Sequence, residues 1–157
     1  MKAKPILLAI LLLTFSKFNL VEAQTNPLTQ EEIVTQINSI LSEHPYKNEY
    51  HFVTQISFKK GKLLVETNYN DFGSKTTHYE FYPEDIGNVY YTKYFGTIYF
   101  ICSGTNDCIK WWWQNDEKFN EKNPQYFSKV FIDFDPDSRV AKELKQLFEL
   151  LLAQTKK

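Results

Sequence analysis

The 157-residue chain has few of the residue types from which metal centres and nucleophilic active sites are built: two cysteines, three histidines, five glycines and one methionine. His44, His51 and His78 have no His-x-x-x-His spacing and therefore predict no zinc site. No serine lies in a Gly-x-Ser-x-Gly nucleophile elbow. We therefore expect a protein with no metal, no cofactor and no enzymatic activity.

A surplus of positive charge is also missing. Eighteen lysines and arginines oppose 19 aspartates and glutamates, for a net charge of −1. Without residues 1–23 the balance is 15 positive minus 18 negative charges, or −3, because three lysines and one glutamate lie in that segment. Binding to nucleic acid depends on basic patches that neutralise phosphates. We therefore expect no nucleic-acid partner.

The first 23 residues have the pattern of a signal peptide. Lys2 and Lys4 precede an apolar run at residues 6–13, and Ala23 is the small residue that a signal peptidase accepts. The run is shorter than the ~20 residues that span a bilayer, so no transmembrane segment is expected in the mature chain. The predicted cleavage follows Ala23, and the first cysteine, Cys102, is far from that position, which argues against a lipid anchor. We expect export to the periplasm or the extracellular medium of a bacterium.

Residues 24–157 have the length and composition of a single globular domain. Aromatic residues make up 17% of the chain, and glycine and methionine are scarce. Residues of this kind favour β-strands with much apolar surface to cover. We therefore expect one secreted α+β domain rather than a disordered segment.

The two cysteines, Cys102 and Cys108, are six residues apart and predict a disulfide in an exported chain. They flank a polar, glycine-containing insert at residues 103–107, which is typical of a hairpin turn. Placing the cysteines opposite each other predicts a β-hairpin over residues 97–113. In that register Tyr99 faces Trp111 on one side, and Trp112 lies on the other side.

One helix is predicted before the strands in the sequence, and a second helix after them. Thr29 followed by Glu32 forms a capping box, and an apolar stripe follows before Pro45 ends the helix. That stripe consists of Ile33, Ile37, Ile40 and Leu41. The second helix begins near Asp135, an N-cap residue that is followed by Pro136. Its stripe consists of Val140, Leu144, Leu147, Phe148 and Leu151, widened by Leu150 and Leu152.

Between these helices the apolar pattern has a period of two residues, which predicts strands. Residues 52–58, 63–67 and 77–82 form a predicted meander, with turns at residues 59–62 and 70–74. A short strand at residues 90–92, the hairpin at residues 97–113 and a last strand at residues 127–134 give about seven antiparallel strands. Residues 114–125 are predicted to be a charged loop.

Seven short strands followed by one amphipathic helix resemble the order of elements in the pleckstrin-homology-like fold, over about residues 51–154. The segment 82–89 is similar to the Pro-x-Asp-Ile-x-x-Val turn of such domains, and Ile98, Phe100 and Cys102 match the Ile-x-Phe-x-Cys strand that follows it. The resemblance implies a partly open barrel of two nearly orthogonal sheets, with the helix closing one end. The whole chain also resembles small secreted bacterial proteins with no assigned activity.

A cystatin-like or nuclear-transport-factor-like fold is the alternative. It accounts for the first helix but not for the last. The phosphoinositide-binding members of the pleckstrin-homology-like fold use basic residues near the first hairpin turn, where this chain has only Lys59, Lys60 and Lys62. An exported bacterial protein does not meet such lipids, so the resemblance implies no lipid binding here. The fold by itself implies no function.

The aromatic residues carry the functional expectation, because exposed Tyr and Trp rings give large contact areas at low entropy cost. We expect a non-catalytic binding or structural module, with a protein as its partner. The alternative is a binder of a small ligand or a carbohydrate, and a small hydrolase is the third possibility. The predicted binding residues are Tyr90, Tyr91, Phe100 and Trp112, within a wider aromatic set that adds Tyr94, Phe95, Phe119 and Tyr126.

Overall fold

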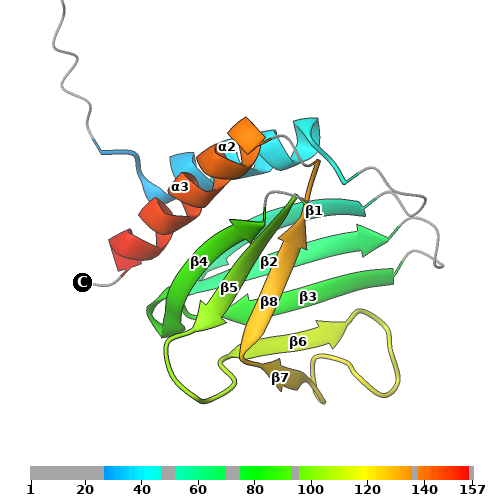
Figure 1. The fold of residues 1–157 in the computed structure, drawn as a ribbon. Coiled ribbons are helices and arrows are strands. Elements are labelled where there is room, and N and C mark those ends of the chain that lie inside the picture. Colours follow the sequence, from blue (N-terminus) through cyan, green and yellow to red (C-terminus); the bar gives the residue numbers. More distant parts are fainter. Residues whose placement is uncertain (1–26, 47–51, 70–74, 93–95, 136–137, 156–157) are drawn as a thin grey trace, which may run out of the picture.

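The computed structural model describes residues 27–46, 52–69, 75–92, 96–135 and 138–155. These residues form two α-helices, one short 3-10 helix and eight strands in two antiparallel sheets (Figure 1). The predicted α+β class, with one helix before and one after the strands, is confirmed, with eight strands rather than seven. The predicted signal peptide, the turn at residues 70–74, His51, Tyr94 and Phe95 lie outside the described residues. The pleckstrin-homology-like resemblance stays a prediction.

The larger sheet has the strand order β1-β2-β3-β6-β7. Its first three strands form the predicted meander, in which Ile56 pairs with Val65 and Val65 pairs with Tyr79. Lys60 and Gly61 both have positive φ angles, as a tight two-residue hairpin turn requires. The strands are β1 (Phe52–Lys59), β2 (Lys62–Tyr69), β3 (Lys75–Phe81), β6 (Ile109–Trp113) and β7 (Gln125–Phe127).

The smaller sheet has the order β4-β5-β8. Its first strand follows a 3-10 helix, η1 (Pro83–Asp85), and begins four residues before the predicted strand at 90–92. The sequence pattern does not show that the strand begins at Ile86, because an irregularity at Gly87 and Asn88, both exposed, interrupts the alternation of buried and exposed residues. The strands are β4 (Ile86–Thr92), β5 (Thr97–Cys102) and β8 (Lys129–Asp133).

The predicted hairpin over residues 97–113 is wrong. β5 pairs with β4 and β8, whereas β6 pairs with β3 and β7, so the two halves belong to different sheets. Both sides of this stretch are apolar, and the pattern therefore could not identify the pairing partners. The insert at residues 103–107 is a corner at which the chain crosses from one sheet to the other.

The predicted disulfide is confirmed: Cys102 and Cys108 are bonded across this corner, with Cα atoms 5.9 Å apart. A disulfide is compatible with an exported protein. A second crossing lies close by, because the predicted strand at residues 127–134 is divided at Ser128 into β7 and β8. The Cys102 N–H donates to the Ser128 carbonyl oxygen at 2.9 Å, so the two crossings are held together.

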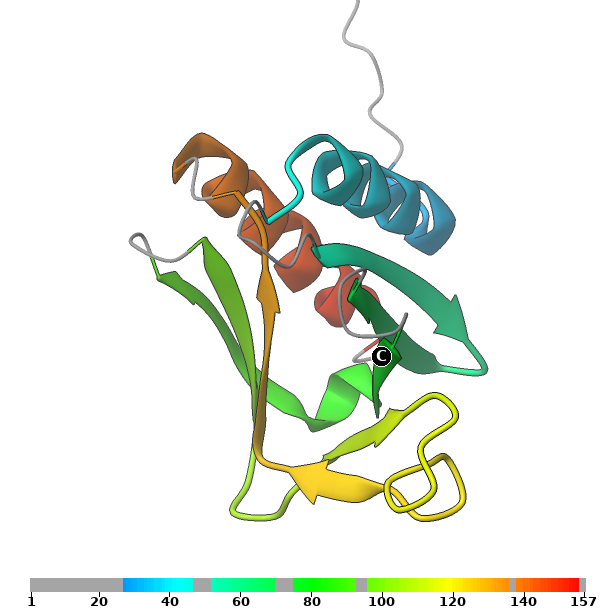
Figure 2. The same cartoon turned by 90° about the vertical axis from the view of Figure 1, so that its right-hand side faces the viewer.

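Both predicted helices are present, although the second begins at Ser138 and the predicted first-turn residue Pro136 lies outside the described residues. The helices lie next to each other at one end of an open barrel, opposite β6 and β7 (Figure 2). In α2 (Gln30–Glu43) the capping box between Thr29 and Glu32 is present. α3 (Ser138–Thr155) buries most of its predicted stripe, although Leu150 is exposed. The largest fully buried side chains of the core include Phe81, Phe100, Phe134 and Phe148, the last of which belongs to α3. None of the helices in the described ranges is long and apolar enough to cross a membrane.

Candidate binding site

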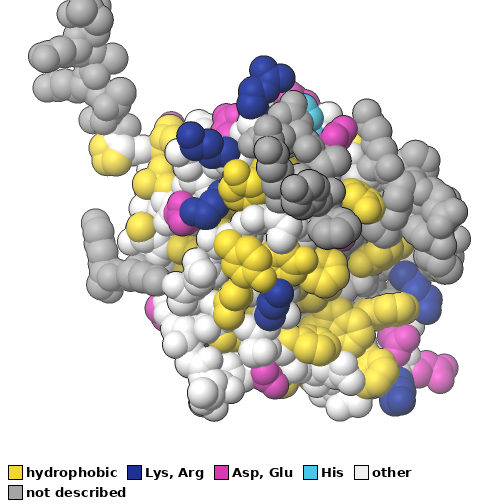
Figure 3. All heavy atoms as spheres, viewed as in Figure 1, with side chains coloured by type: hydrophobic (Ala, Val, Ile, Leu, Met, Phe, Trp, Pro, Cys, Tyr) yellow, Lys and Arg dark blue, Asp and Glu magenta, His cyan; other side chains and the backbone are white. Residues whose placement is uncertain are grey.

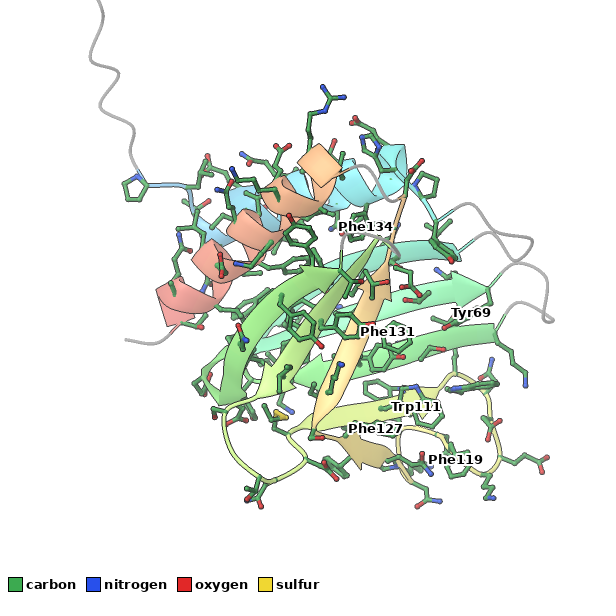
Figure 4. The ribbon with its side chains drawn as sticks, in the orientation of Figure 1. Tyr69, Trp111, Phe119, Phe127, Phe131 and Phe134 are labelled. Carbon is green, nitrogen blue, oxygen red and sulfur yellow. A yellow bond between two sulfur atoms is a disulfide. The ribbon has the colours of Figure 1, made fainter. Side chains whose placement is uncertain are left out.

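An aromatic surface lies on the open side of the barrel, where the smaller sheet approaches β3, β6 and β7 (Figures 3 and 4). Phe131 is 49% exposed and Phe127 is 39% exposed, which is unusual for side chains of this size. Hydrophobic side chains gather across this side in Figure 3. We define the aromatic face by six residues: Tyr90, Tyr99, Trp111, Phe127, Lys129 and Phe131.

The smaller sheet contributes a row of three rings. Tyr90 pairs with Tyr99 across β4 and β5, and Tyr99 pairs with Phe131 across β5 and β8. Because paired residues in neighbouring strands point to the same side, the three rings are brought into contact. The Tyr90 and Tyr99 rings stack with centroids 4.8 Å apart, and the Tyr99 and Phe131 rings lie 5.9 Å apart at 54°.

The larger sheet contributes a second group of rings around Trp111. The Trp111 ring has three aromatic neighbours, with ring centroids 5.8–5.9 Å away and ring planes at steep or tilted angles to its own: Trp113, Phe119 and Phe127. Trp111 and Trp113 are on the same side of β6 because they are two residues apart. Contacts of this kind contribute about 0.5–1.5 kcal/mol each beyond simple burial, so the group is held in place before any partner arrives.

A cavity of about 270 Å³ opens between the two groups of rings. Its walls are mainly apolar, and Phe131, Trp111 and Phe127 point toward it from β8, β6 and β7 (Figure 4). Lys129 is the one charged residue in its lining. The full lining is Tyr79, Trp111, Phe127, Lys129, Val130 and Phe131.

The Lys129 side chain lies over the tyrosine row. Its Nζ atom is 4.0 Å from the centroid of the Tyr99 ring and 5.3 Å from that of the Tyr90 ring, which is cation–π geometry. No carboxylate among the described residues is within ion-pair distance of this ammonium. The aromatic face therefore combines apolar rings with one positive charge that has no acidic partner in the described part of the chain.

A small polar cluster lies behind Phe131, around a cavity of about 20 Å³, which has room for one water molecule. Burial raises the pKa of Asp133, and the Thr97 hydroxyl, which donates to Asp133 Oδ1 at 2.7 Å, opposes this increase. Burial also raises the pKa values of Tyr69 and Tyr79. Burial therefore disfavours the ionised form of all three groups.

A second cavity, of about 570 Å³, lies at the end of β6 beside the loop that leads to β7. Most of its lining residues are polar, although polar and apolar groups contribute similarly to its wall. The loop is ordered by its own hydrogen bonds: Asp116 Oδ1 accepts from the backbone N–H groups of Lys118 and Phe119. These two bonds lower the pKa of Asp116, burial opposes the decrease, and the charges of Lys75 and Lys118 add a smaller lowering effect. The lining is Trp112, Trp113, Gln114, Asn115, Asp116, Glu117, Asn120, Glu121 and Lys122.

Of the four predicted binding residues, only Tyr90 lies on the aromatic face. Phe100 is fully buried and contacts Phe148, so it cannot belong to an exposed surface. Tyr91 is half-buried and packs against the core. In the wider predicted set, Phe119 contacts Trp111 at the border of the aromatic face, and Tyr126 is exposed on the opposite side of β7.

Trp112 was predicted to be a binding residue on an exposed aromatic surface, but it is only 8% exposed and faces away from Trp111. Its ring stacks on His78, with centroids 4.9 Å apart, and the Lys110 ammonium lies 4.6 Å from its centroid. Burial lowers the pKa of His78, and the nearby carboxylate of Glu66 opposes this decrease. Trp112 therefore packs against its neighbours on the outer side of the larger sheet.

Four residues of the aromatic face were not predicted from the sequence pattern as binding residues: Tyr99, Phe127, Lys129 and Phe131. Tyr99 and Trp111 were expected to face each other within one hairpin, whereas they lie in separate sheets. The available signal was the alternation in β8, where Val130 and Ile132 are buried and Phe131 must point the other way. Phe131 becomes informative only together with the neighbouring rings, because a contiguous exposed apolar patch indicates a binding surface whereas a single exposed residue does not.

Within the described ranges, no three His, Cys, Asp or Glu side chains are close enough together to hold a metal ion. No protein-family model, curated protein or solved structure matches the chain. The candidate site therefore depends on the geometry of the aromatic face alone.

Proposed function

We propose that the protein is a non-catalytic binding module that holds a protein partner on the aromatic face. The observation that carries this proposal is the apolar cavity of about 270 Å³, bordered by the exposed rings of Phe127 and Phe131. Exposed aromatic residues that surround a concave site are typical anchors of protein interfaces. Their prior packing reduces the entropy that binding must overcome.

The size and chemistry of the cavity favour a side chain over a free small ligand. Pockets for small molecules usually enclose about 300–1,000 Å³ and provide several polar groups that orient the ligand. This cavity is smaller, and its one charged group is the Lys129 ammonium. A sugar would leave most of its hydroxyl groups without partners there, whereas an apolar side chain would not.

Site-specific photo-crosslinking tests the proposal with a matched pair of positions. Phe127 and Tyr126 are neighbours in β7, but they point to opposite sides of the sheet. A photoreactive phenylalanine at position 127 or 131, introduced in the native cell, should capture a partner that position 126 does not capture. The purified partner should then bind Phe131→Ser at least about tenfold more weakly, as expected for an anchor, and Tyr126→Ser unchanged. Equal capture from positions 126 and 127 would reject the aromatic face.

A second candidate function is carbohydrate binding in the cavity of about 570 Å³ beside β6. Aromatic, amide and carboxylate groups together suit sugar rings and their hydroxyls. Trp113 lines this cavity, and its buried indole Nε1 has no hydrogen-bond partner among the described residues, so a ligand oxygen would satisfy it if the indole turned toward the cavity. Titration with soluble oligosaccharides tests this function: Trp113→Phe, which keeps a ring but removes the N–H, should weaken binding that involves this site.

We further propose that the module acts in the periplasm or outside a bacterial cell, and that it belongs to the pleckstrin-homology-like fold. The disulfide and the pattern of residues 1–23 support export. N-terminal sequencing of the protein recovered from the periplasm or the medium should find a mature chain that begins near Gln24. Recovery of the full-length chain from the cytoplasm alone would reject export.

A further inference from the structure

We propose that the partner segment presents an aromatic side chain next to a carboxylate: the ring enters the cavity of the aromatic face and the carboxylate pairs with Lys129. This inference rests on the proposed function and names the chemistry of the partner. It commits to an acidic protein segment as the occupant.

The first step concerns the position of the Lys129 charge. Lys129 lines the cavity, its ammonium lies 4.0 Å from the Tyr99 ring centroid, and no described carboxylate is within ion-pair distance of it. The contacts with Tyr99 and Tyr90 hold the long side chain against the rings, so less side-chain entropy is lost when an ion pair forms. An anionic group at the mouth of the cavity would meet this ammonium.

The second step concerns the other lysines that border the aromatic face. Lys75 lies over Trp113, and Lys118 lies over Phe119, with Nζ atoms 4.4 and 4.8 Å from the ring centroids. The Asp116 carboxylate is close enough for both charges to lower its pKa slightly. Of these three lysines, only Lys129 lines the cavity of the aromatic face, so it is the cation that an occupant of the cavity would meet.

The third step concerns the side chain of the partner that enters the cavity. Trp111 and Phe127 already meet edge to face, at 80°. A third ring that enters the cavity beside them can adopt the same tilted geometry, which aromatic rings prefer over face-to-face stacking. The volume of about 270 Å³ suits one aromatic side chain. A carboxylate next to that ring, either on a neighbouring acidic residue or at a chain end, would then lie near Lys129.

Two small probes with the same ring test the inference. N-acetyl-phenylalanine carries a carboxylate, and N-acetyl-phenylalaninamide is its neutral counterpart. Titration of the oxidised full-length protein, followed by ¹H–¹⁵N NMR, should shift the amide signals of Trp111, Phe127 and Phe131 with both probes. The anion should bind about two- to fivefold more tightly, as expected for a partly exposed ion pair, and this preference should fall in about 0.5 M salt.

Lys129→Gln should remove the preference for the anion while the neutral probe still binds, and Lys129→Arg should restore it. Lys110→Gln is the matched control, because Lys110 makes the same type of ring contact with Trp112 on the outer side of the sheet. Equal binding of the two probes to the wild type would overturn the acidic partner but leave the proposed function intact. If neither probe shifts the signals of the aromatic face, the proposed function fails as well.

Discussion

The Asn38 side chain makes two hydrogen bonds with the backbone of Ile56. Its Nδ2 donates to the Ile56 carbonyl oxygen, and its Oδ1 accepts from the Ile56 N–H, each at 2.8 Å. Ile56 lies in β1, an outer strand of the larger sheet, where backbone groups would otherwise have no strand partner. A side chain of α2 therefore occupies part of the edge on which another strand could add.

Asn38→Ala should lower the free energy of unfolding by about 1–3 kcal/mol, because it leaves two partly buried backbone groups unpaired. Asn38→Asp should retain the acceptor and lose the donor, so its effect should be intermediate. Urea unfolding measures both losses, and light scattering during refolding should show more aggregation for Asn38→Ala. An unchanged unfolding midpoint for Asn38→Ala would contradict this role.

Asp133→Asn should stabilise the protein at neutral pH. Burial raises the pKa of Asp133 in the folded state, so folding favours the protonated carboxyl. Its ionisation therefore costs no stability below the unfolded-state pKa near 4, and the cost grows as the pH rises through the folded-state pKa. Asparagine keeps an acceptor for the Thr97 hydroxyl without the charge.

Urea midpoints at pH 7 and near pH 4 check this prediction. The advantage of Asp133→Asn should be present at pH 7 and should shrink at the acidic pH. Asp107→Asn removes the same charge from an exposed position in the corner loop and serves as the control. A destabilised Asp133→Asn at pH 7 would show that the carboxylate itself is needed.

Gly87→Ala should destabilise the protein by about 1–3 kcal/mol. A Cβ atom at Gly87 would lie 2.7 Å from the Ser103 Cα, and this backbone is held by the bond from the Ser103 N–H to the Asp85 carbonyl oxygen. Gly104→Ala is the matched control, since a Cβ there comes no closer than 4.0 Å to other atoms. Equal unfolding midpoints for the two variants would argue against this close approach.

Loss of the disulfide should cost about 2 kcal/mol, because it closes a short loop and restricts the unfolded chain only modestly. The Cys102→Ala, Cys108→Ala double variant and the reduced wild type should unfold at similar urea concentrations, both lower than that of the oxidised wild type. The corner loop contributes little else to the core, so the far-UV circular dichroism should be retained. Loss of all folded structure would show that the bond is required to join the sheets.

Local signals predicted much of the fold. The capping box of Thr29 and Glu32 requires only neighbouring residues, and so does the meander, whose turns are short. The disulfide followed from two cysteines six residues apart. Each of these features is fixed by residues close in sequence, where propensity and spacing are informative.

Pairing between distant strands could not be predicted in the same way. Tyr79 pairs with Trp111 and Tyr99 pairs with Phe131, and each pairing spans 32 residues (111 − 79 and 131 − 99). Strands with apolar residues on both sides fit several neighbours equally well. The aromatic face arises from these pairings, so the sequence identified its residue types and only Tyr90 among its members.

The chain passes between the two sheets three times, from β3 to β4, from β5 to β6 and from β7 to β8. During synthesis from the N-terminus, β3 is made well before its partner β6, and β5 is made well before its partner β8. Such long-range pairings are slow to form and leave unpaired edges in the growing chain. β8 is the last strand to appear and it carries Lys129 and Phe131, so a chain cut short before Lys129 has neither a complete smaller sheet nor a complete aromatic face.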